Sequence, residues 1–204
     1  MKKKHYRNPI IIILIMGVFY LITRLIKYDP AKGYIYKENF LDQDDYTHLL
    51  NELKLYDDQL NYSKEDNSAV TRYNLVIDSN NNTHTPNPVT ALLKKYQREI
   101  RTMTQNQSLY LANNFPIEYR KYVPGSVMQK HKDTLIYKIP QYECVLTLSN
   151  TTDSVTKMKE TPIKASPNSL IIVRALGIEH EVTKVTKGER KFLKFIFTET
   201  DQRV

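Results

Sequence analysis

Apolar side chains follow two different spacings along the chain, and the change between them lies near Phe115. Before that point, apolar residues of 38–60 and 89–103 recur every three or four positions, which is typical of amphipathic helices. A short linker over 28–36 leads into an expected first strand. After Phe115, short apolar runs alternate with polar residues, which is typical of strands. The pattern therefore predicts helices first and a sheet second.

The second half of the chain contains short strand-like segments with turn residues between them, among them the Pro-Gly pair at 124–125. Short strands without intervening helices favour an antiparallel sandwich or barrel. We therefore expect an α+β fold in which a β-barrel-like half follows the helices. The expected strands are Ile117–Val123, Thr134–Lys138, Glu143–Ser149, Leu170–Val173 and Phe192–Phe197.

An apolar segment without charged residues, Pro9–Thr23, lies near the N-terminus. Extended to Ile26, about 18 residues of helix reach roughly 27 Å, near the lower limit for crossing a bilayer. A secretory signal peptide is the first alternative, but no small-x-small cleavage site follows the segment. A buried core helix is the second, but the segment has no polar face. We expect a retained transmembrane anchor over 1–27, ahead of one domain over 28–204.

Basic residues are more concentrated before this segment than after it, which favours a cytoplasmic N-terminus and a lumenal body. The expected protein is therefore single-pass, with its body in the endoplasmic reticulum or secretory pathway and its membrane contact through residues 9–26. Asn-x-Ser/Thr sequences in the body permit glycosylation in such a compartment. They begin at Asn61, Asn81, Asn106 and Asn150.

The net charge of +8 comes mainly from the N-terminal segment. Residues 1–27 hold six of the 30 Lys and Arg and none of the 22 Asp and Glu, so the rest of the chain has 24 against 22, or +2. A nearly neutral body argues against a nucleic-acid partner. The single cysteine, Cys144, excludes an intramolecular disulfide and a multi-cysteine metal site.

Three residues of the β-rich half form a candidate metal site. His131 and Asp133 face the same way on an extended segment, and His180 can add a third ligand from a neighbouring strand. Two imidazoles and one carboxylate on one face of an octahedron are the ligand set of non-haem Fe(II) sites. An isolated His-x-Asp pair is more often a solvated surface feature, so the surrounding residues decide.

An arginine, Arg190, lies ten residues after His180, at the start of the last apolar strand. Its guanidinium group has the geometry to form a bidentate pair with a carboxylate. An ordinary arginine at a strand edge is the simpler reading when the residue is taken alone.

Together these motifs resemble the prolyl 4-hydroxylase-like branch of the Fe(II)/2-oxoglutarate-dependent dioxygenases. The residues that match are Tyr122-Val-Pro-Gly125, then His131-Lys-Asp133, then His180 followed by Arg190 within Lys-Gly-Glu-Arg. The resemblance covers roughly residues 37–198. It implies a double-stranded β-helix, or jelly roll, with helical support over 37–110 and a jelly-roll core over 111–198.

The resemblance also implies an activity: an Fe(II)- and 2-oxoglutarate-dependent dioxygenase that hydroxylates a protein or peptide side chain, most often proline. Ascorbate belongs to the cofactors expected for such an enzyme. The catalytic triad that holds Fe(II) is His131, Asp133 and His180. Arg190 is expected to grip the distal carboxylate of 2-oxoglutarate, with Tyr122 and Thr147 as further cosubstrate contacts.

Two features depart from the family pattern. The glycines of a Gly-Gly-x-Thr element are missing from 151–157, and the interval between Asp133 and His180, residues 134–179, is short. A membrane-tethered, catalytically degenerate jelly-roll binding module is therefore the main alternative. A nucleic-acid oxygenase of the same superfamily is disfavoured by the body's charge, and a purely structural membrane protein is disfavoured by the triad.

Overall fold

The computed structural model describes residues 33–66, 69–77, 87–138 and 140–204. The anchor expected over 1–27 lies outside these ranges. No helix of the described residues has the length and apolar character needed to cross a membrane.

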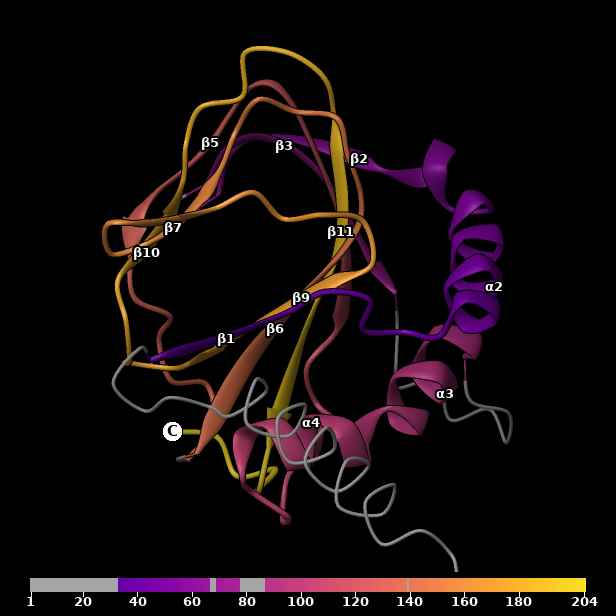
Figure 1. Ribbon diagram of the computed structural model, residues 1–204, viewed down its shortest axis with the longest axis vertical. Helices are drawn as coiled ribbons and strands as arrows, with labels where there is room; N and C mark the ends of the chain where they lie inside the picture. The colour runs from indigo at the N-terminus through magenta and orange to yellow at the C-terminus, as the bar shows by residue number, and fades with distance from the viewer. Residues whose placement is uncertain (1–32, 67–68, 78–86, 139) are drawn as a thin grey trace, which may run out of the picture.

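Within the described ranges, eleven strands form one sheet, and it curls into a barrel-like shape with the helices on one side (Figure 1). The strands are β1 (Tyr34–Lys37), β2 (Asn61–Asp66), β3 (Ala69–Ile77), β4 (Tyr110–Leu111), β5 (Ile117–His131), β6 (Gln141–Asn150), β7 (Thr156–Met158), β8 (Thr161–Ile163), β9 (Ser169–Arg174), β10 (His180–Val182) and β11 (Arg190–Thr198). Their order is β1-β9-β6-β11-β5-β10-β7-β8, with β3 on β5, β2 on β3 and β4 on β11. Neighbouring strands run antiparallel, as the sequence predicts.

Two predicted helices are present, with different limits. The first, α2 (Gln43–Lys54), begins where the Asp42 carboxylate accepts a hydrogen bond from the backbone N–H of Asp45 (2.8 Å). It is shorter than the predicted range of 38–60, because it begins only after Asp42 and a 3-10 turn, η1 (Asp57–Gln59), replaces its predicted end.

The second predicted helix is divided at Tyr96 into α3 (Pro88–Lys95) and α4 (Gln97–Thr104). The Tyr96 hydroxyl donates to Asp45 Oδ2 (2.7 Å) and accepts from the backbone N–H of Asp42 (2.9 Å). The division therefore lies where a buried side chain attaches the junction to the start of α2, a tertiary contact that apolar spacing does not encode.

The segment Thr134–Lys138 is not a strand, contrary to the prediction from its alternating pattern. Only Tyr137 makes an isolated bridge there, to Arg203. The backbone N–H groups of Ile136 and Tyr137 both donate to the Gln141 side-chain oxygen, at 2.7 and 3.0 Å. A side chain thus takes the place that a neighbouring strand would fill.

The Pro124–Gly125 pair, expected as a turn, is a bend inside the long strand β5. Gly125 adopts φ +97°, a conformation that favours glycine, and its N–H donates to the Val185 carbonyl (2.9 Å). Before the bend β5 pairs with β11, and after it β5 pairs with β10. The strand therefore passes from one part of the sheet to the other and carries His131 to its far end.

Alternation along β5, β6 and β11 separates an outer face from an inner face. The outer side chains pack against the helices in one apolar core, while the inner side chains line pockets. Among the outer residues are Tyr119, Leu146, Leu193, Phe195 and Phe197, and the helices contribute Leu49, Leu53, Leu93 and Ile100.

The hairpin of β2 and β3 extends the sheet beyond β5, and no strand was expected over residues 61–77. β2 is almost entirely polar, with the sequence Asn-Tyr-Ser-Lys-Glu-Asp, so it shows no apolar alternation. β3 pairs with β5 from Ile77, opposite Ile117, to Ala69. Pairing with β5, rather than local pattern, defines these strands.

Asp57 of η1 ties the helical layer to the sheet and gives a pH-dependent prediction. Its carboxylate accepts from the Tyr119 hydroxyl (2.6 Å) and from Lys191 Nζ (2.8 Å). Burial alone raises the pKa of Asp57, but these two bonds outweigh it, and the pKa lies below its ordinary 3.8. The unfolded chain therefore takes up a proton at higher pH than the folded one, so the stabilisation is complete above about pH 5 and is lost as the pH falls through the folded pKa.

We expect Asp57→Asn to lower the free energy of unfolding by about 1 kcal/mol at pH 7, because a partly exposed charged bond contributes modestly. The difference from the native chain should shrink as the pH falls below 4. Urea unfolding of both chains from pH 7 to pH 3 measures it, with the exposed Asp58→Asn as control. A difference of constant size across this range contradicts the assignment.

Candidate metal centre and anion pocket

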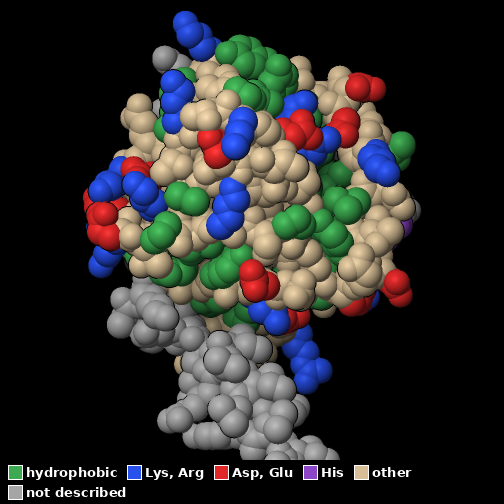
Figure 2. Space-filling model, turned by 45° about the horizontal axis from the view of Figure 1, so that its top comes forward, with side chains coloured by type: hydrophobic (Ala, Val, Ile, Leu, Met, Phe, Trp, Pro, Cys, Tyr) green, Lys and Arg blue, Asp and Glu red, His purple; other side chains and the backbone are tan. Residues whose placement is uncertain are grey.

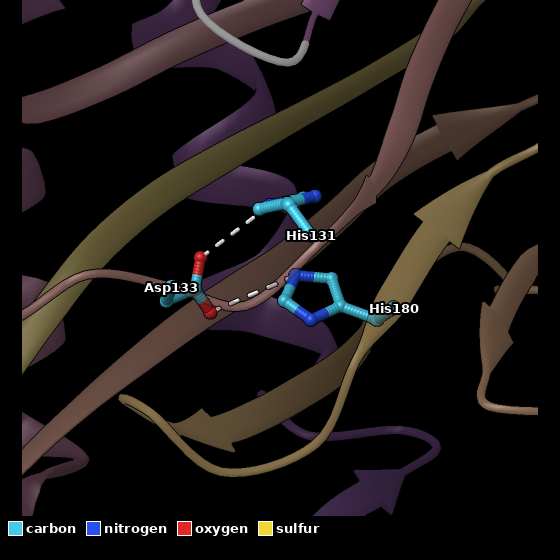
Figure 3. A group of neighbouring side chains, drawn as sticks. All are labelled: His131, Asp133 and His180. Atoms are coloured by element: carbon cyan, nitrogen blue, oxygen red, sulfur yellow. Dashed lines mark ion pairs between the residues drawn. The ribbon is translucent and has the colours of Figure 1, made fainter.

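Two histidines face each other across paired strands. His131 ends β5 and His180 begins β10, and the two are directly opposite in the antiparallel register. Their ring centroids lie 4.4 Å apart. Asp133 follows β5 by two residues and turns its carboxylate toward both rings (Figure 3).

The carboxylate of Asp133 bridges the two histidines. Oδ1 lies 3.6 Å from His131 Nε2, and Oδ2 lies 3.6 Å from His180 Nε2. One donor atom from each of the three residues lies within 4.8 Å of the other two. The structure thus brings together the three residues that the sequence suggests as iron ligands, close enough for one cation to contact all three.

Backbone carbonyls orient both imidazoles for ligation. Nδ1 of His131 lies 2.7 Å from the Gln129 carbonyl, and Nδ1 of His180 lies 3.2 Å from the Ile178 carbonyl. A neutral imidazole that donates from Nδ1 keeps the Nε2 lone pair for a metal, and such second contacts are typical of metal-binding histidines.

The surroundings give two of these groups the protonation state that ligation needs. Burial raises the pKa of Asp133, but the neighbouring His131 imidazole and the charges of His180 and Lys194 outweigh it, so the pKa is below its usual value. Burial lowers the pKa of His180. The nearby carboxylate of Asp133 raises the pKa of His131, because it attracts a positive charge to the space between them. A metal cation can take the place of that proton.

The donor set fits Fe(II). Two imidazole nitrogens and one carboxylate oxygen match its ligand preference, and three protein ligands leave coordination positions for other molecules. The buried Cys144 is not part of this group of residues in the described chain.

An inner pocket with a volume of about 60 Å³ lies between two members of this group and Arg190. Asp133 and His180 line it together with Arg190, and apolar side chains form most of the wall between them. These wall residues are Tyr122, Val145, Met158, Ile171, Val173, Val182 and Phe192.

Arg190 is a buried cation, and no ion pair with a described carboxylate neutralises it. It is 3% exposed, and it donates to the hydroxyls of Thr156 (3.0 Å) and Thr147 (3.1 Å). Its Nε has no hydrogen-bond partner. Burial lowers the pKa of Arg190 to about 10, so the group stays charged at neutral pH. Burying an uncompensated charge is costly, so this arrangement favours an anion in the pocket.

The two softer cosubstrate candidates also lie here. Thr147 holds the guanidinium group of Arg190, and Tyr122 lines the pocket with its ring edge-on to Phe192 at 5.0 Å. Thr156 was not singled out from the sequence, although it lies in the stretch where the family's glycines are missing. Its hydrogen bond to Arg190 shows that 151–157 contributes to the pocket without those glycines.

Three further charged residues, Arg120, Glu143 and Lys194, line the pocket near Asp133 and were not predicted. Lys194 lies four residues from Arg190, Glu143 lies four residues from Thr147, and Arg120 lies two residues from Tyr122. Because residues an even number of positions apart share one face of a strand, this spacing could have indicated all three from the sequence.

No protein-family model matches the sequence, and no curated protein matches it. Solved structures do match its fold. A prolyl 4-hydroxylase from Pseudomonas putida aligns with a TM-score of 0.61 and 18% identity, covering 82% of this chain and 93% of that one. A prolyl hydroxylase from Trichoplax adhaerens, in complex with a hypoxia inducible factor peptide fragment, aligns at 0.60 and 13%, covering 84% and 86%.

The chain has the fold of the 2-oxoglutarate-Fe(II) oxygenases. A third neighbour, HygX from Streptomyces hygroscopicus, contains nickel, 2-oxoglutarate and hygromycin B, and it aligns at a TM-score of 0.58 with 12% identity, covering 82% and 83%. The expected jelly roll with preceding helices is thus confirmed as the oxygenase fold, within the described residues.

Proposed function

We propose that this protein is an Fe(II)- and 2-oxoglutarate-dependent oxygenase. One observation carries the proposal: Asp133 and His180 of the clustered His131, Asp133 and His180 group line the same pocket as a buried arginine that has no carboxylate partner among the described residues. Metal ligands at one end of a cavity and an anion-binding arginine at the other suit a cosubstrate that binds a metal through one end and has a free carboxylate at the other.

Each part of the pocket has a separate task. The two histidines and Asp133 hold the metal, and the backbone carbonyls behind the imidazoles fix their orientation. Arg190 binds the distal carboxylate of 2-oxoglutarate, positioned by the hydroxyls of Thr147 and Thr156. The apolar wall excludes water from the space between them. When bound, iron and 2-oxoglutarate would supply the chemistry that uses dioxygen: one oxygen atom converts a substrate C–H bond to C–OH, and the other is taken up as 2-oxoglutarate is converted to succinate and carbon dioxide.

We propose a protein or peptide side chain as the substrate, with proline as the first candidate. Support comes from the prolyl hydroxylases among the structural neighbours and from the Tyr122 to Asp133 motif. We also propose that residues 9–26 anchor the domain to a membrane on its lumenal side, as the N-terminal sequence indicates.

The alternatives account for less of the structure. A degenerate binding module needs neither the grouping of His131, Asp133 and His180 nor a buried arginine without a described carboxylate partner in the same pocket. A nucleic-acid substrate calls for a basic surface, whereas the face in Figure 2 interleaves acidic and basic side chains.

Succinate formation tests the proposed activity. The full chain, supplied with Fe(II), 2-oxoglutarate and oxygen, should release succinate, and omitting iron or adding a chelator should abolish the release. Mass spectrometry of a proline-containing peptide library then identifies the substrate by the gain of one oxygen atom. Succinate formation that equals the metal-free background in the presence of the whole library would contradict the proposal.

A further inference from the structure

The segment between β5 and β6 contains the proposed metal ligand Asp133 but forms no strand ladder. Within the described ranges, residues 132–135 have no strand partner, and Tyr137 makes only one isolated bridge. Backbone groups that lie outside a ladder need other partners, and without them a segment opens readily. The contacts that fix the place of Asp133 must therefore come from elsewhere in the fold.

Gln141, the first residue of β6, supplies such contacts through its side-chain amide. The amide oxygen accepts from the backbone N–H groups of Ile136 (2.7 Å) and Tyr137 (3.0 Å). The amide nitrogen donates to the backbone carbonyl of Thr134 (3.1 Å). The side chain is completely buried, at 0% exposure. Because Thr134 directly follows Asp133, the amide holds the chain immediately beside the ligand.

The surroundings of this amide determine its orientation. Two N–H donors face one end of it, whereas the Thr134 carbonyl and the Glu143 carboxylate (3.5 Å) face the other. Only the oxygen can accept from the donors, and only the nitrogen can donate to the carbonyl and the carboxylate. An amide therefore fits this position, and neither an apolar side chain nor a carboxylate can replace all of its bonds.

The backbone of Gln141 supports the same region from a second side. Its carbonyl accepts from the N–H of Ala175 (2.9 Å). The next residue, Leu176, donates its N–H to the carbonyl of Asp133 itself (2.9 Å). Both supports of Asp133, the turn at 174–177 and the buried amide, thus depend on contacts with Gln141.

The position of Asp133 decides whether the three proposed ligands can share one cation. Its two carboxylate oxygens each lie 3.6 Å from an imidazole Nε2. His131 and His180 are placed by the pairing of β5 with β10, whereas Asp133 lies outside the strands. A binding site needs its groups within about 0.5 Å of the productive geometry, which takes support from residues behind them. Asp133 is the ligand that needs this support most.

We propose that Gln141 is a positioning residue of the metal centre. Its buried amide holds the segment after Asp133 so that the carboxylate meets His131 and His180 around one cation. The inference rests on the proposed oxygenase function, because it concerns the metal centre of that function. Removing the amide should displace Asp133, so that metal affinity falls although all three ligands remain in the chain.

Calorimetry with Co(II), which stands in for Fe(II), tests this on the metal-free full chain without turnover. We expect Gln141→Leu to bind Co(II) about 10- to 100-fold more weakly than the native chain, the loss typical when a contact behind a metal ligand is removed. At saturating Co(II), the visible absorption bands of the variant should also differ from those of the native chain, because they depend on ligand number and geometry. A general loss of stability would leave these bands unchanged.

Two further variants complete the comparison. Gln141→Glu keeps the acceptor for the two N–H groups but places an oxygen against the Thr134 carbonyl, so it should bind Co(II) about 10-fold more weakly and serves if Gln141→Leu does not fold. Asn168→Ala is the matched control, since the buried Asn168 amide also makes two bonds to backbone, at Leu41 (3.0 and 2.8 Å), and is not part of the metal group. It should lower the Tm while keeping the native Co(II) affinity and spectrum.

The outcomes separate this inference from the proposed activity. Native Co(II) affinity and spectrum in a folded Gln141 variant overturn the inference and leave the oxygenase proposal intact. An equal loss in Asn168→Ala also overturns it, because the effect would then follow from stability alone. A native chain that binds Co(II) more tightly than the Gln141 variants but releases no succinate with Fe(II) supports the inference and refutes only the activity. A native chain that binds no Co(II) overturns both.

Discussion

Alanine in place of His131 should reduce iron-dependent succinate formation by about 1,000-fold or more. Losing an outer-shell contact of a metal ligand already costs about 10- to 100-fold, and this substitution removes a ligand itself. The imidazole also forms one side of the bridge through Asp133 (3.6 Å), so its loss leaves that carboxylate with a single histidine partner.

The rate of succinate release and the iron retained after gel filtration check this expectation together. His48→Ala is the matched control, because His48 lies exposed on α2, away from the metal group. We expect the control to keep both its iron and its activity. Equal turnover by the His131 variant and the control would refute the proposed metal centre.

Arg190→Ala should raise the KM for 2-oxoglutarate by about 100-fold, with a smaller effect on kcat. The guanidinium group is buried, so removing it leaves the cosubstrate carboxylate desolvated and without a cation. Arg190→Lys should recover part of the affinity, because an ammonium group supplies charge without the two-pronged geometry that suits a carboxylate.

Thermal unfolding gives a second test of the arginine, independent of turnover. Added 2-oxoglutarate should raise the Tm of the native chain with metal, since a ligand that binds only the folded state stabilises it. The Arg190→Ala chain should show almost no rise at the same concentration, whereas Arg174→Ala, at the exposed end of β9, should respond like the native chain. An undiminished rise in the Arg190 variant would place the carboxylate elsewhere.

The candidate site residues could be picked out from the sequence more easily than the bends and breaks in the strands and helices. Ligand spacing on an extended segment, and an arginine at the start of a strand, are local features, and the structure brings the three ligands together, with Asp133 and His180 lining the same pocket as Arg190. The bend at Gly125 and the break at Tyr96 depend on contacts with Val185 and Asp45, which lie far away in sequence. Local pattern therefore predicted a turn at the first position and one continuous helix at the second.

The charged inner residues show the same distinction. Glu143 and Lys194 occupy positions that alternate with buried apolar residues, so each looks like an ordinary solvent-facing residue of a half-exposed strand. Only closure of the sheet turns that face inward and makes their ion pair (2.6 Å) part of a cavity. Sequence periodicity identifies which residues share a face, but pairing between distant strands decides what that face contains.

Anomalous X-ray diffraction at the iron absorption edge, from crystals of the full chain grown anaerobically with Fe(II) and 2-oxoglutarate, would locate the metal. We expect one strong iron peak bonded to Nε2 of His131, Nε2 of His180 and a carboxylate oxygen of Asp133. A chain saturated with iron that shows no peak between these three side chains would contradict this expectation.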